Sequence, residues 1–581
     1  MRDWTDVSID WDALDGEKFA DERQAARKLE DAVGLSPEGR QAASDAAIKL
    51  VEKARETRHG GGLMESFLQE FGLSNKEGLA LMCLAEALLR VPDAETADDL
   101  IAEKIGSGSW VEHAWKSDNW LVNASTIGLM MTGSILKVDS RAEKNPGEYF
   151  KQMAGRLGEP VIRTAVKRAM RILGEQFVLG RDIESAIKRG RGWKTYGKVK
   201  PLFSFDMLGE GARTEKDAKR YLDKYRHAIR VVAEKRQKGS IEDVDGVSVK
   251  LTALHPRYQA VRQAQVMEEL YPRALELAQM AKDADLGFSL DAEESDRLVI
   301  QLKIFDRLAR EPSLAGWDGL GIVIQAYQKR AMSVLEKLIE LGQETGRRFM
   351  VRLVKGAYWD TEIKFAQMNG QTDFPVWTTK PATDLNYLAC ARVMLTAPDQ
   401  IYSQFATHNA HSLCAVREMA KQAGVEHYEF QRLHGMGDAL YAAAAKLHEA
   451  RPVRIYAPVG SHEDLLPYLV RRLLENGANT SFVHSFLDPE VPVEDVARGP
   501  FRDAETIDRH ARIPLPGDLY GEERANSKGL DLAQARVRAS LAKAFRDFEM
   551  AEPITAAPLV NGKLLDGAAH HIMSPVDSGE Y

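Results

Sequence analysis

Short apolar runs alternate with longer amphipathic stretches between residues 200 and 460 of the chain. Each run has the length of a β-strand, and most runs are followed by enough residues for a crossover helix. Strands that alternate with helices predict a parallel sheet, and eight such units in about 280 residues predict an α/β fold, a (β/α)8 barrel of the TIM type. The predicted strands are FSFDML (203–208), VSVKLTAL (247–254), GFSLDAEE (287–294), GIVIQAY (321–327), FMVRLVKGAY (349–358), YSQFATHN (402–409), YEFQRLHG (428–435) and RIYAPVG (454–460).

The last predicted strand is followed by a clear helix signal. Ser461 and Asp464 form a start that resembles a capping box, and Gly477 is placed to end the helix as a left-handed cap. The apolar stripe of this helix consists of Leu465, Leu466, Leu469, Val470, Leu473 and Leu474. The residues that can share the opposite surface are Tyr468, Arg471, Arg472 and Glu475.

Arg471 and Arg472 admit two interpretations. In the first, they lie on a solvated face, where Arg471 pairs with Glu475 at spacing i, i+4 and contributes only about 0.3–0.5 kcal/mol. In the second, both guanidinium groups lie at the mouth of the barrel and clamp a planar carboxylate. The position of the helix favours the second interpretation, because the loop after the last strand of a barrel lies on the catalytic face.

The flanking segments have other patterns. The segment Glu77–Arg90 is apolar nearly all round and is predicted to be a buried helix, whereas Leu530–Met550 is predicted to be a charged helix. We therefore divide the chain into an N-terminal arm (1–45), an all-helical domain and linker arm (46–195), the barrel domain (196–485), a connector (486–550) and the beginning of a further domain (551–581).

The composition is that of a soluble cytoplasmic protein. The net charge of −8 and the lack of a long Lys/Arg run argue against a nucleic-acid-binding surface. Cys83, Cys390 and Cys414 are isolated and have no zinc-ligand spacing, which fits a reducing compartment. The acidic N-terminus does not resemble a signal peptide, and no apolar run approaches the roughly 18 residues that a membrane-spanning helix needs.

Polar residues recur towards the carboxyl ends of the predicted strands, where barrel enzymes carry their chemistry. These residues are Asp206, Lys250, Asp291, Gln325, Arg352, Lys355, His408, His434 and Tyr456. Lys250 and Arg352 stand inside apolar strands, where an unpaired charge would be costly. Together with Lys355 and the two arginines of the last helix they suggest an anionic ligand. The alternative is a structural ion pair, for which Asp291 is the natural partner of Lys250.

Several common catalytic motifs are absent from the sequence, namely GxxxxGK, GxGxxG after a strand, and a GxSxG elbow with a plausible triad. A metal-dependent hydrolase on the same barrel is the main alternative, since Asp206, Asp291, His408 and His434 could ligate zinc or manganese. The spacing of these residues is poor for a metal, and no strand carries an H-x-H pair. We therefore expect no metal site.

Several motifs together resemble the proline dehydrogenase barrel of the proline utilization A family of bifunctional bacterial flavoenzymes. They are VSVKLTALHPRY, SLDAEE, GIVIQAYQKR, VRLVKGAYWD, QFATHNAH, EFQRLHGMG, RIYAPVG and YLVRRLLENGANTSF. The resemblance extends upstream to near residue 40, and the tail NGK…SPVDSGEY resembles the first segment of the family's aldehyde dehydrogenase half. The resemblance implies FAD-dependent oxidation of L-proline to Δ1-pyrroline-5-carboxylate, the first step of proline catabolism to glutamate. Hydride would pass to N5 of the flavin, and the electrons would then pass to a membrane quinone.

The resemblance also implies roles for individual residues. Arg471 and Arg472 would clamp the proline carboxylate, and Lys250 with Asp291 would form an ion pair beside the proline ring. The walls around that ring would be Tyr358, Leu433 and Tyr456. The residues that match family contacts to FAD are Gln325, Arg352, Lys355, Ala357, Trp359, Thr378, Lys380, Thr383, His408, Glu475 and Asn476. Arg352 would lie near flavin N5, where its charge stabilises the reduced ring.

The chain departs from the family pattern in two respects. Some family members begin with a basic DNA-binding domain; because the N-terminus here is acidic, we expect no DNA binding. The catalytic part of an aldehyde dehydrogenase half would lie beyond Tyr581, so this chain is expected to be a fragment without that second activity. We expect at most peripheral contact with the inner face of the cell membrane, and assembly with further copies through the full-length protein. A non-catalytic scaffold is disfavoured because the predicted site set is intact: Lys250, Asp291, Arg352, Tyr456, Arg471 and Arg472.

Overall fold

The structure is a computed structural model that describes residues 9–56, 178–193, 195–197, 199–448, 451–460, 491–501, 508–551, 556–568 and 570. These residues belong to two compact units, Met1–Gln534 and Ala535–Tyr581. The first unit contains the barrel and all the candidate site residues that the structure describes.

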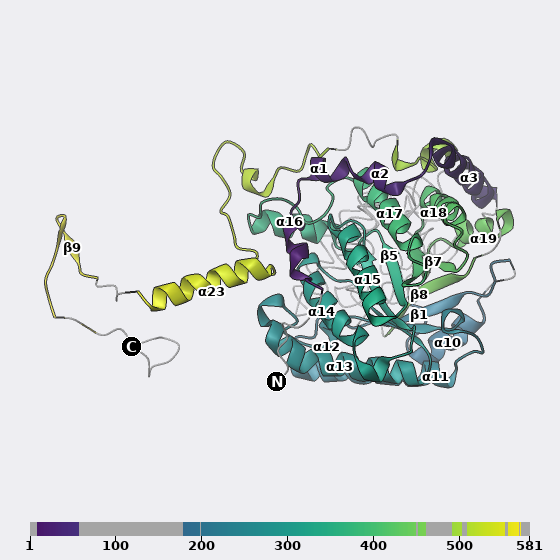
Figure 1. Cartoon of the computed structure of the whole chain (residues 1–581), viewed down its shortest axis with the longest axis horizontal. Helices are drawn as coiled ribbons and strands as arrows, with labels where there is room; N and C mark the ends of the chain where they lie inside the picture. The colour runs from purple at the N-terminus through teal and green to yellow at the C-terminus, as the bar shows by residue number, and fades with distance from the viewer. Residues whose placement is uncertain are drawn as a thin grey trace, which may run out of the picture. The chain divides into compact units, whose positions relative to one another are not determined.

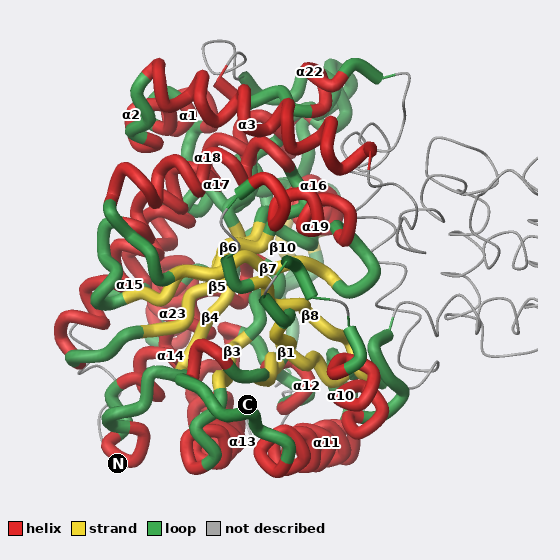
Figure 2. Tube along the Cα trace, turned by 90° about the vertical axis from the view of Figure 1, so that its right-hand side faces the viewer, coloured by secondary structure: helices red, strands yellow, loops and turns green. Residues whose placement is uncertain are grey.

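Eight parallel strands close into a barrel in which each strand pairs with the next one in sequence and the last pairs with the first. The strands are β1 (Leu202–Met207), β2 (Gly246–Val249), β3 (Gly287–Leu290), β4 (Leu320–Gln325), β5 (Phe349–Val354), β6 (Ile401–Ala406), β7 (Tyr428–Leu433) and β8 (Val453–Val459). They form the centre of the unit, and helices surround them (Figure 1, Figure 2). The predicted (β/α)8 barrel is therefore confirmed.

A helical segment follows each of the first seven strands. The main helices are α11 (Glu215–Glu234), α13 (Gln263–Asp283), α14 (Leu298–Ala309), α15 (Ala331–Thr345), α16 (Trp359–Met368), α17 (Lys380–Leu395), α18 (Ala410–Ala423) and α19 (Asp438–Leu447). Local sequence sets several of their ends. Thr214 and Asp217 form a capping box at the start of α11. Gly346 and Gly424 end α15 and α18 with φ values of 61° and 66°, a conformation that glycine adopts without steric cost.

The strands end earlier than the sequence predicted. β2 ends at Val249, and the following residues form the short helix α12 (Leu251–Leu254) instead of continuing the strand to residue 254. All four residues of α12 are buried, and periodicity cannot distinguish a short buried helix from a buried strand. β3 and β5 likewise end at Leu290 and Val354. As a result, several charged residues that were predicted within strands lie directly after them.

The N-terminal segment, for which the sequence predicted only an arm, is helical. Its elements are the 3-10 helix η1 (Asp12–Gly16) and the helices α1 (Glu22–Ala26), α2 (Leu29–Val33) and α3 (Pro37–Glu56). α3 continues through residue 45, where the arm was predicted to end. It buries a stripe of mostly small residues that is weakly apolar in sequence: Ala43, Ala47, Leu50, Val51 and Ala54. α2 packs on α17, and α3 packs on α18 and α19 (Figure 1). The predicted buried helix Glu77–Arg90 lies outside the described residues.

The remaining described elements are small. In the first unit they are α10 (Ile183–Arg191), α22 (Val493–Val496) and the 3-10 helices Ile241–Asp243, Ala260–Arg262, Ser295–Arg297, Pro312–Leu314 and Pro516–Asp518. In the second unit, α23 (Ala535–Glu549) begins five residues after the predicted start of the charged helix, and an antiparallel hairpin of β9 (Leu559–Val560) and β10 (Lys563–Leu564) follows. Among the helices that the structure describes, none has the length and apolar character needed to cross a bilayer.

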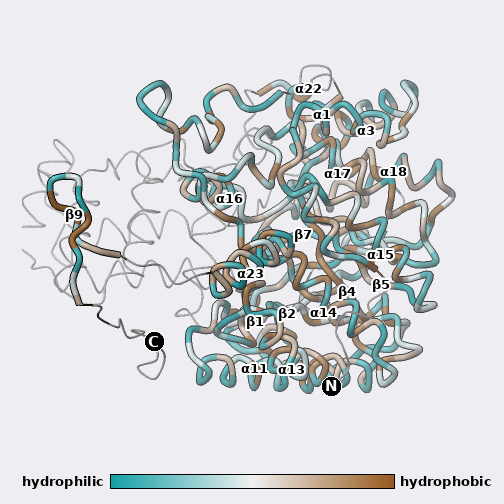
Figure 3. The backbone as a smooth tube through the Cα atoms, turned by 60° about the vertical axis from the view of Figure 1, so that its left-hand side comes forward, coloured by the Kyte–Doolittle hydropathy of each residue, from teal (hydrophilic) through white to brown (hydrophobic). Residues whose placement is uncertain are grey.

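The core of the barrel combines apolar strands with buried ions. All residues of β4 are buried. Hydrophobic stretches run through the strands and through the helices around them (Figure 3). Near the amino ends of the strands, Arg454 on β8 pairs with Glu429 on β7 at 2.7 Å, and both side chains are almost completely buried. Gln404 and Gln431 donate hydrogen bonds to the same carboxylate. Each charge of the pair is buried in the barrel interior, away from water, and is compensated by its partner and by these hydrogen bonds.

We predict that Arg454→Met destabilises the chain strongly, because it leaves Glu429 buried without its guanidinium partner. The expected loss is about 3–5 kcal/mol. As a control, Arg226→Met removes a partly exposed pair with Glu276 and should cost less than about 1 kcal/mol. Urea denaturation followed by tryptophan fluorescence measures both changes. Equal midpoints for the two variants would contradict the structural role of the buried pair.

Candidate active site

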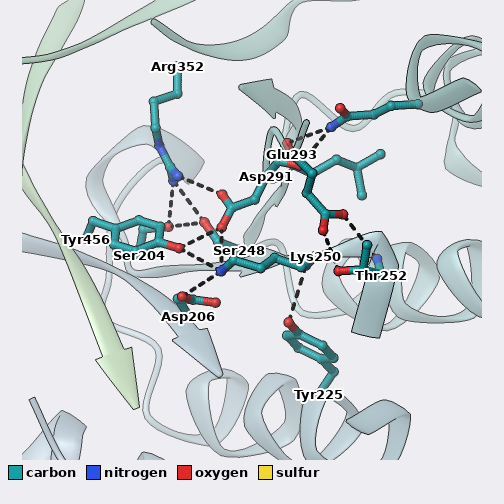
Figure 4. A network of polar contacts seen from close by, with 12 residues as sticks. Ser204, Asp206, Tyr225, Ser248, Lys250, Thr252, Asp291, Glu293, Arg352 and Tyr456 are labelled. Atoms are coloured by element: carbon teal, nitrogen blue, oxygen red, sulfur yellow. Dashed lines mark hydrogen bonds and ion pairs between the residues drawn. The ribbon is translucent and has the colours of Figure 1, made fainter. Parts of the chain in front are cut away.

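Lys250, directly after β2, is the centre of a buried polar network at the carboxyl ends of the strands (Figure 4). Its ammonium group donates to Asp206 Oδ2 (2.8 Å), to the hydroxyl of Tyr456 (3.1 Å) and to Asp291 Oδ2 (3.3 Å). Tyr456 in turn donates to Asp291 Oδ2 at 2.7 Å. Asp206 lies on β1, Asp291 follows β3 and Tyr456 lies on β8. Four segments of the barrel thus supply one cluster.

Arg352 on β5 joins this cluster from the other side of the barrel. Its Nη1 donates to Asp291 Oδ1 at 2.9 Å. Its Nη2 donates to the hydroxyls of Ser204 (2.8 Å) and Ser248 (2.9 Å), on β1 and β2. The guanidinium carbon lies 5.1 Å from the centre of the Tyr456 ring. We refer to Lys250, Asp206, Asp291, Arg352 and Tyr456 as the Lys250 network.

The formal charges of the Lys250 network balance, since two cations face two carboxyl groups. Burial alone would lower the pKa of Lys250, but Asp206, Tyr456 and Asp291 outweigh burial and raise this pKa well above its ordinary value. Burial raises the pKa of Asp206, and Lys250 acts in the opposite direction. Lys250 therefore stays protonated. With Arg352 it supplies two positive charges against two carboxylates, so a bound anion would need further cations.

A second charged group lies at the start of α17. Lys355, just after β5, and Lys380, the first residue of α17, both donate to the carboxylate of Asp384. Burial alone would raise the pKa of Asp384, but the two ammonium groups lower it to about 2. Burial lowers the pKa of Lys355 to about 8 against the pull of Asp384. We call these three residues the Asp384 cluster. Because it pairs two cations with one anion at the N-terminus of a helix, it favours an anionic ligand.

The loops between these two groups are tied together by hydrogen bonds. Gln325, at the end of β4, accepts from the amide of Ala357 (3.1 Å) and donates to the carbonyl oxygen of Glu293 (2.8 Å). Trp359 Nε1 donates to the carbonyl oxygen of Trp377 (2.8 Å), which joins the start of α16 to the segment before α17. The predicted site residues Gln325, Ala357 and Trp359 thus take part in the hydrogen bonds that join these segments.

The other predicted residues lie nearby on the same end of the barrel. Thr378 and Thr383 flank Lys380 in sequence at the start of α17. His408 follows β6, and its Nε2 accepts from the amide of Leu433 at 3.1 Å. Leu433 is in register with Tyr456 on the neighbouring strand.

Tyr358 is the N-cap residue of α16 and packs against the apolar cluster that contains Tyr327 and Phe374. The predicted site residues Arg471, Arg472, Glu475 and Asn476 lie outside the described residues. The structure therefore brings together the charged residues of the strand ends. The roles predicted for the residues of the last helix stay predictions.

Sequence reasoning missed several participants, of which Ser204, Ser248 and Asp384 are the clearest. Ser204 stands two residues before Asp206, and Ser248 two residues before Lys250. Because strand side chains alternate between faces, this spacing places each serine on the same face as its charged neighbour and could have indicated its role. Asp384 stands four residues after Lys380, the spacing of a helical ion pair.

The residues proposed as metal ligands are engaged otherwise. Asp206 and Asp291 face the ammonium group of Lys250, and His408 accepts from a backbone amide. The ring of His434 packs edge-on against Trp193, with 5.2 Å between ring centres. Cations rather than open coordination positions therefore surround the carboxylates. The metal-dependent hydrolase is not favoured.

We predict that Lys250→Met makes stability more dependent on pH. Without its ammonium partner, buried Asp206 should have a pKa raised further above the unfolded value of about 3.9. A carboxyl group with a raised pKa in the folded state contributes stability at low pH that is lost as the pH rises through that pKa. Measured by urea denaturation, the deficit relative to the unaltered chain should be larger at pH 8 than at pH 5, by about 1.4 kcal/mol per pKa unit.

The control for this experiment is Lys53→Met, which removes an exposed pair with Glu56. Its deficit should be small and equal at the two pH values. If the deficit of Lys250→Met is also equal at both pH values, Asp206 does not depend on Lys250 for its charge.

The sequence and fold of this chain are similar to those of several known proteins. The chain is 46% identical over 565 residues to "Bifunctional protein PutA" of Salmonella typhimurium, an alignment that covers 94% of this chain and 42% of that protein. It is 28% identical over 316 residues to "Proline dehydrogenase 1" of Bacillus subtilis, covering 54% of this chain and 90% of that protein. A crystal structure of a proline utilization A mutant from Bradyrhizobium japonicum superposes with a TM-score of 0.70 at 47% identity, covering 93% of this chain and 53% of that one.

A family model described as the DNA-binding domain of proline dehydrogenase matches residues 63–177. This match counts against the expectation that the chain has no DNA-binding domain, which was drawn from the acidic N-terminus. The matched residues lie outside the described part of the structure. The expectation is not retained.

The family model for proline dehydrogenase matches residues 191–485, just over half of the 581 residues. This range contains all eight barrel strands, the Lys250 network and the Asp384 cluster. The chain spans less than half the length of the Salmonella protein, but it covers most of the shorter Bacillus protein. The chain belongs to the proline dehydrogenase family.

Proposed function

We propose that the chain catalyses the FAD-dependent oxidation of L-proline to Δ1-pyrroline-5-carboxylate. The observation that carries this proposal is the buried Lys250 network, which lies at the catalytic end of the barrel within the region that matches the proline dehydrogenase model. When bound, the flavin would accept at N5 the hydride that leaves the carbon beside the proline nitrogen. The protein must then orient substrate and cofactor, and it needs no nucleophile of its own.

The residues near α17 fit a flavin dinucleotide. FAD contains a diphosphate, and the Asp384 cluster offers two ammonium groups at the N-terminus of a helix. The hydroxyl oxygen of Thr379, the N-cap residue of α17, is buried and has no hydrogen-bond partner among the described residues. We propose that the residues that hold FAD are Gln325, Arg352, Lys355, Ala357, Trp359, Thr378, Lys380, Thr383, His408, Glu475 and Asn476.

The residues proposed to act on proline include members of the Lys250 network and the two arginines that follow the last strand in sequence. Arg471 and Arg472 would hold its carboxylate, which suits the neutral charge balance of the Lys250 network. The Lys250–Asp291 pair would lie beside the ring, which would be enclosed by Tyr358, Leu433 and Tyr456. The residues that we propose as catalytic are Lys250, Asp291, Tyr456, Arg471 and Arg472.

The proline nitrogen must be neutral when hydride leaves, and this constrains the assignment of a base. In the described part of the site, both carboxylates of the Lys250 network already pair with cations. We therefore assign no catalytic base and propose that the amine loses its proton on binding. Resemblance to the family supports further proposals: electron transfer to quinone, a cytoplasmic location with peripheral contact at the inner face of the membrane, and assembly through the full-length protein.

The visible absorption spectrum of the purified chain tests the function. We expect a flavin spectrum that bleaches when L-proline is added without oxygen. A flavin spectrum that stays unchanged would support FAD as the cofactor but would contradict L-proline as the substrate. A protein that neither carries nor binds FAD would overturn the proposed function.

We predict that Tyr456→Phe lowers kcat/KM for proline about tenfold, which corresponds to about 1.4 kcal/mol. The ring remains, but the hydroxyl that contacts Asp291 and Lys250 is lost. The control is Tyr402→Phe, which removes a buried hydroxyl that donates to Glu429 away from the Lys250 network. Steady-state kinetics should show the loss for Tyr456→Phe alone. A similar loss in both variants would point to a general packing defect.

We predict that Arg472→Met raises the KM for proline steeply while the flavin stays bound. Losing one charge-assisted bidentate contact should cost roughly 1.5–3 kcal/mol. The flavin spectrum of the variant serves as the control for cofactor content. An unchanged KM would remove Arg472 from the carboxylate clamp.

A further inference from the structure

Thr378, just before α17, is held by two segments that lie outside the barrel in sequence. Its amide donates to Oε1 of Glu22 at 2.7 Å, and its hydroxyl lies 3.0 and 2.9 Å from the two oxygens of the same carboxylate. Glu22 is the first residue of α1, in the N-terminal segment. From the other end of the chain, the amide of His510 donates to the Thr378 hydroxyl oxygen at 2.9 Å.

The carboxylate of Glu22 is completely buried, and further ions surround it. Lys329 donates to the carbonyl oxygen of Ala20 (2.9 Å) and to Asp373 (3.2 Å), while Arg509 donates to the other oxygen of Asp373 (2.5 Å). Burial raises the pKa of Glu22, whereas Lys329 and the hydrogen bonds from Thr378 act in the opposite direction. A buried carboxylate with such partners holds its neighbours in one arrangement, because few alternative arrangements satisfy its charge.

Thr378 lies directly before the N-terminus of α17. Thr379 is the N-cap residue of that helix, and Lys380 is its first residue. Lys380 and Lys355 converge on Asp384 one turn later. Since Thr378 is fixed on both its amide and its hydroxyl, Glu22 also restrains the residues that present the positive end of α17.

We propose that Glu22 is a positioning residue for the FAD-binding end of α17, acting through Thr378. This inference rests on the proposed function, since it assigns the anionic ligand of α17 to the diphosphate of FAD. Glu22 lies in the N-terminal segment, outside the residues that match the proline dehydrogenase model. The N-terminal segment would thus contribute to the cofactor site although it adds no strand to the barrel.

The N-terminal segment has several other anchors, so losing Glu22 alone should leave it in place. Trp11 Nε1 donates to Asp306 at 2.6 Å. Lys18 is buried and pairs with Asp296 (2.5 Å) and Asp531 (2.7 Å). None of these contacts involves Thr378, so the effect of removing Glu22 should be local to the start of α17.

The test compares Glu22→Ala and Glu22→Gln with the control Arg23→Ala. Arg23 pairs with Asp508 and so joins the same two outer segments, but this pair is exposed and does not contact Thr378. The apoprotein of each variant is titrated with FAD by flavin fluorescence, and the KM for proline is measured at saturating FAD. Urea midpoints report the stability of each variant.

We expect the Kd for FAD to rise about tenfold in Glu22→Ala, equivalent to about 1.4 kcal/mol. A rise of about threefold is expected in Glu22→Gln, which keeps one acceptor oxygen, and Arg23→Ala should stay within twofold. The KM for proline at saturating FAD should be unchanged in all three. If Glu22→Ala does not fold, the Kd of Glu22→Gln for FAD tests the positioning role.

Two results would overturn the positioning role: an unchanged Kd in the folded Glu22 variants, or a higher Kd accompanied by an equal rise in the KM for proline. The second result would show a general structural defect rather than a local one. Failure of the unaltered apoprotein to bind FAD would instead overturn the proposed function. The two failures are therefore distinguishable.

Discussion

Burial of charge inside the barrel is the constraint on which the catalytic end depends. Lys250 and Arg352 are almost completely removed from water, a state that is stable only when each cation contacts an anion in a suitable geometry. Their partners come from other strands, so the ions can pair only when the strands are in the observed register. A slip of one residue would turn an entire strand's side chains to the opposite face. The Glu429–Arg454 pair likewise requires the observed strand register, near the amino ends of the strands.

The balanced formal charges of the Lys250 network affect which ligands the site can bind. Two cations already balance two carboxylates, so the network itself attracts an anionic substrate only weakly. A substrate that carries both a carboxylate and an amine would therefore need separate cations for its carboxylate, the role proposed for Arg471 and Arg472. The Asp384 cluster differs, because its two cations outnumber its one anion. The two groups thus divide the mouth of the barrel into a balanced part and a positive part.

The barrel could be predicted from sequence because apolar periodicity is local and recurs eight times. The ends of the strands were harder to predict. The segment around Lys250 is an example, because the apolar run continues from β2 into α12 without a change in pattern. Lys250 and Asp291 could be expected to pair, since both stand at strand ends. The contact of Glu22 with Thr378 could not be expected, because residues 356 positions apart share no pattern in the sequence. The first part of α3, up to residue 45, was not predicted, because its buried residues there are only Gly39 and Ala43, which give no apolar pattern.

The contacts of Thr378 also set an order of events during synthesis. Glu22 is made early, but its partner belongs to the later part of the barrel, and His510 follows after the last strand. A chain grows from its N-terminus, and folded elements form as they emerge. The contact between Glu22 and Thr378 therefore cannot form until most of the barrel has been synthesised. The start of α17 acquires its full set of restraints only after residue 510 has left the ribosome.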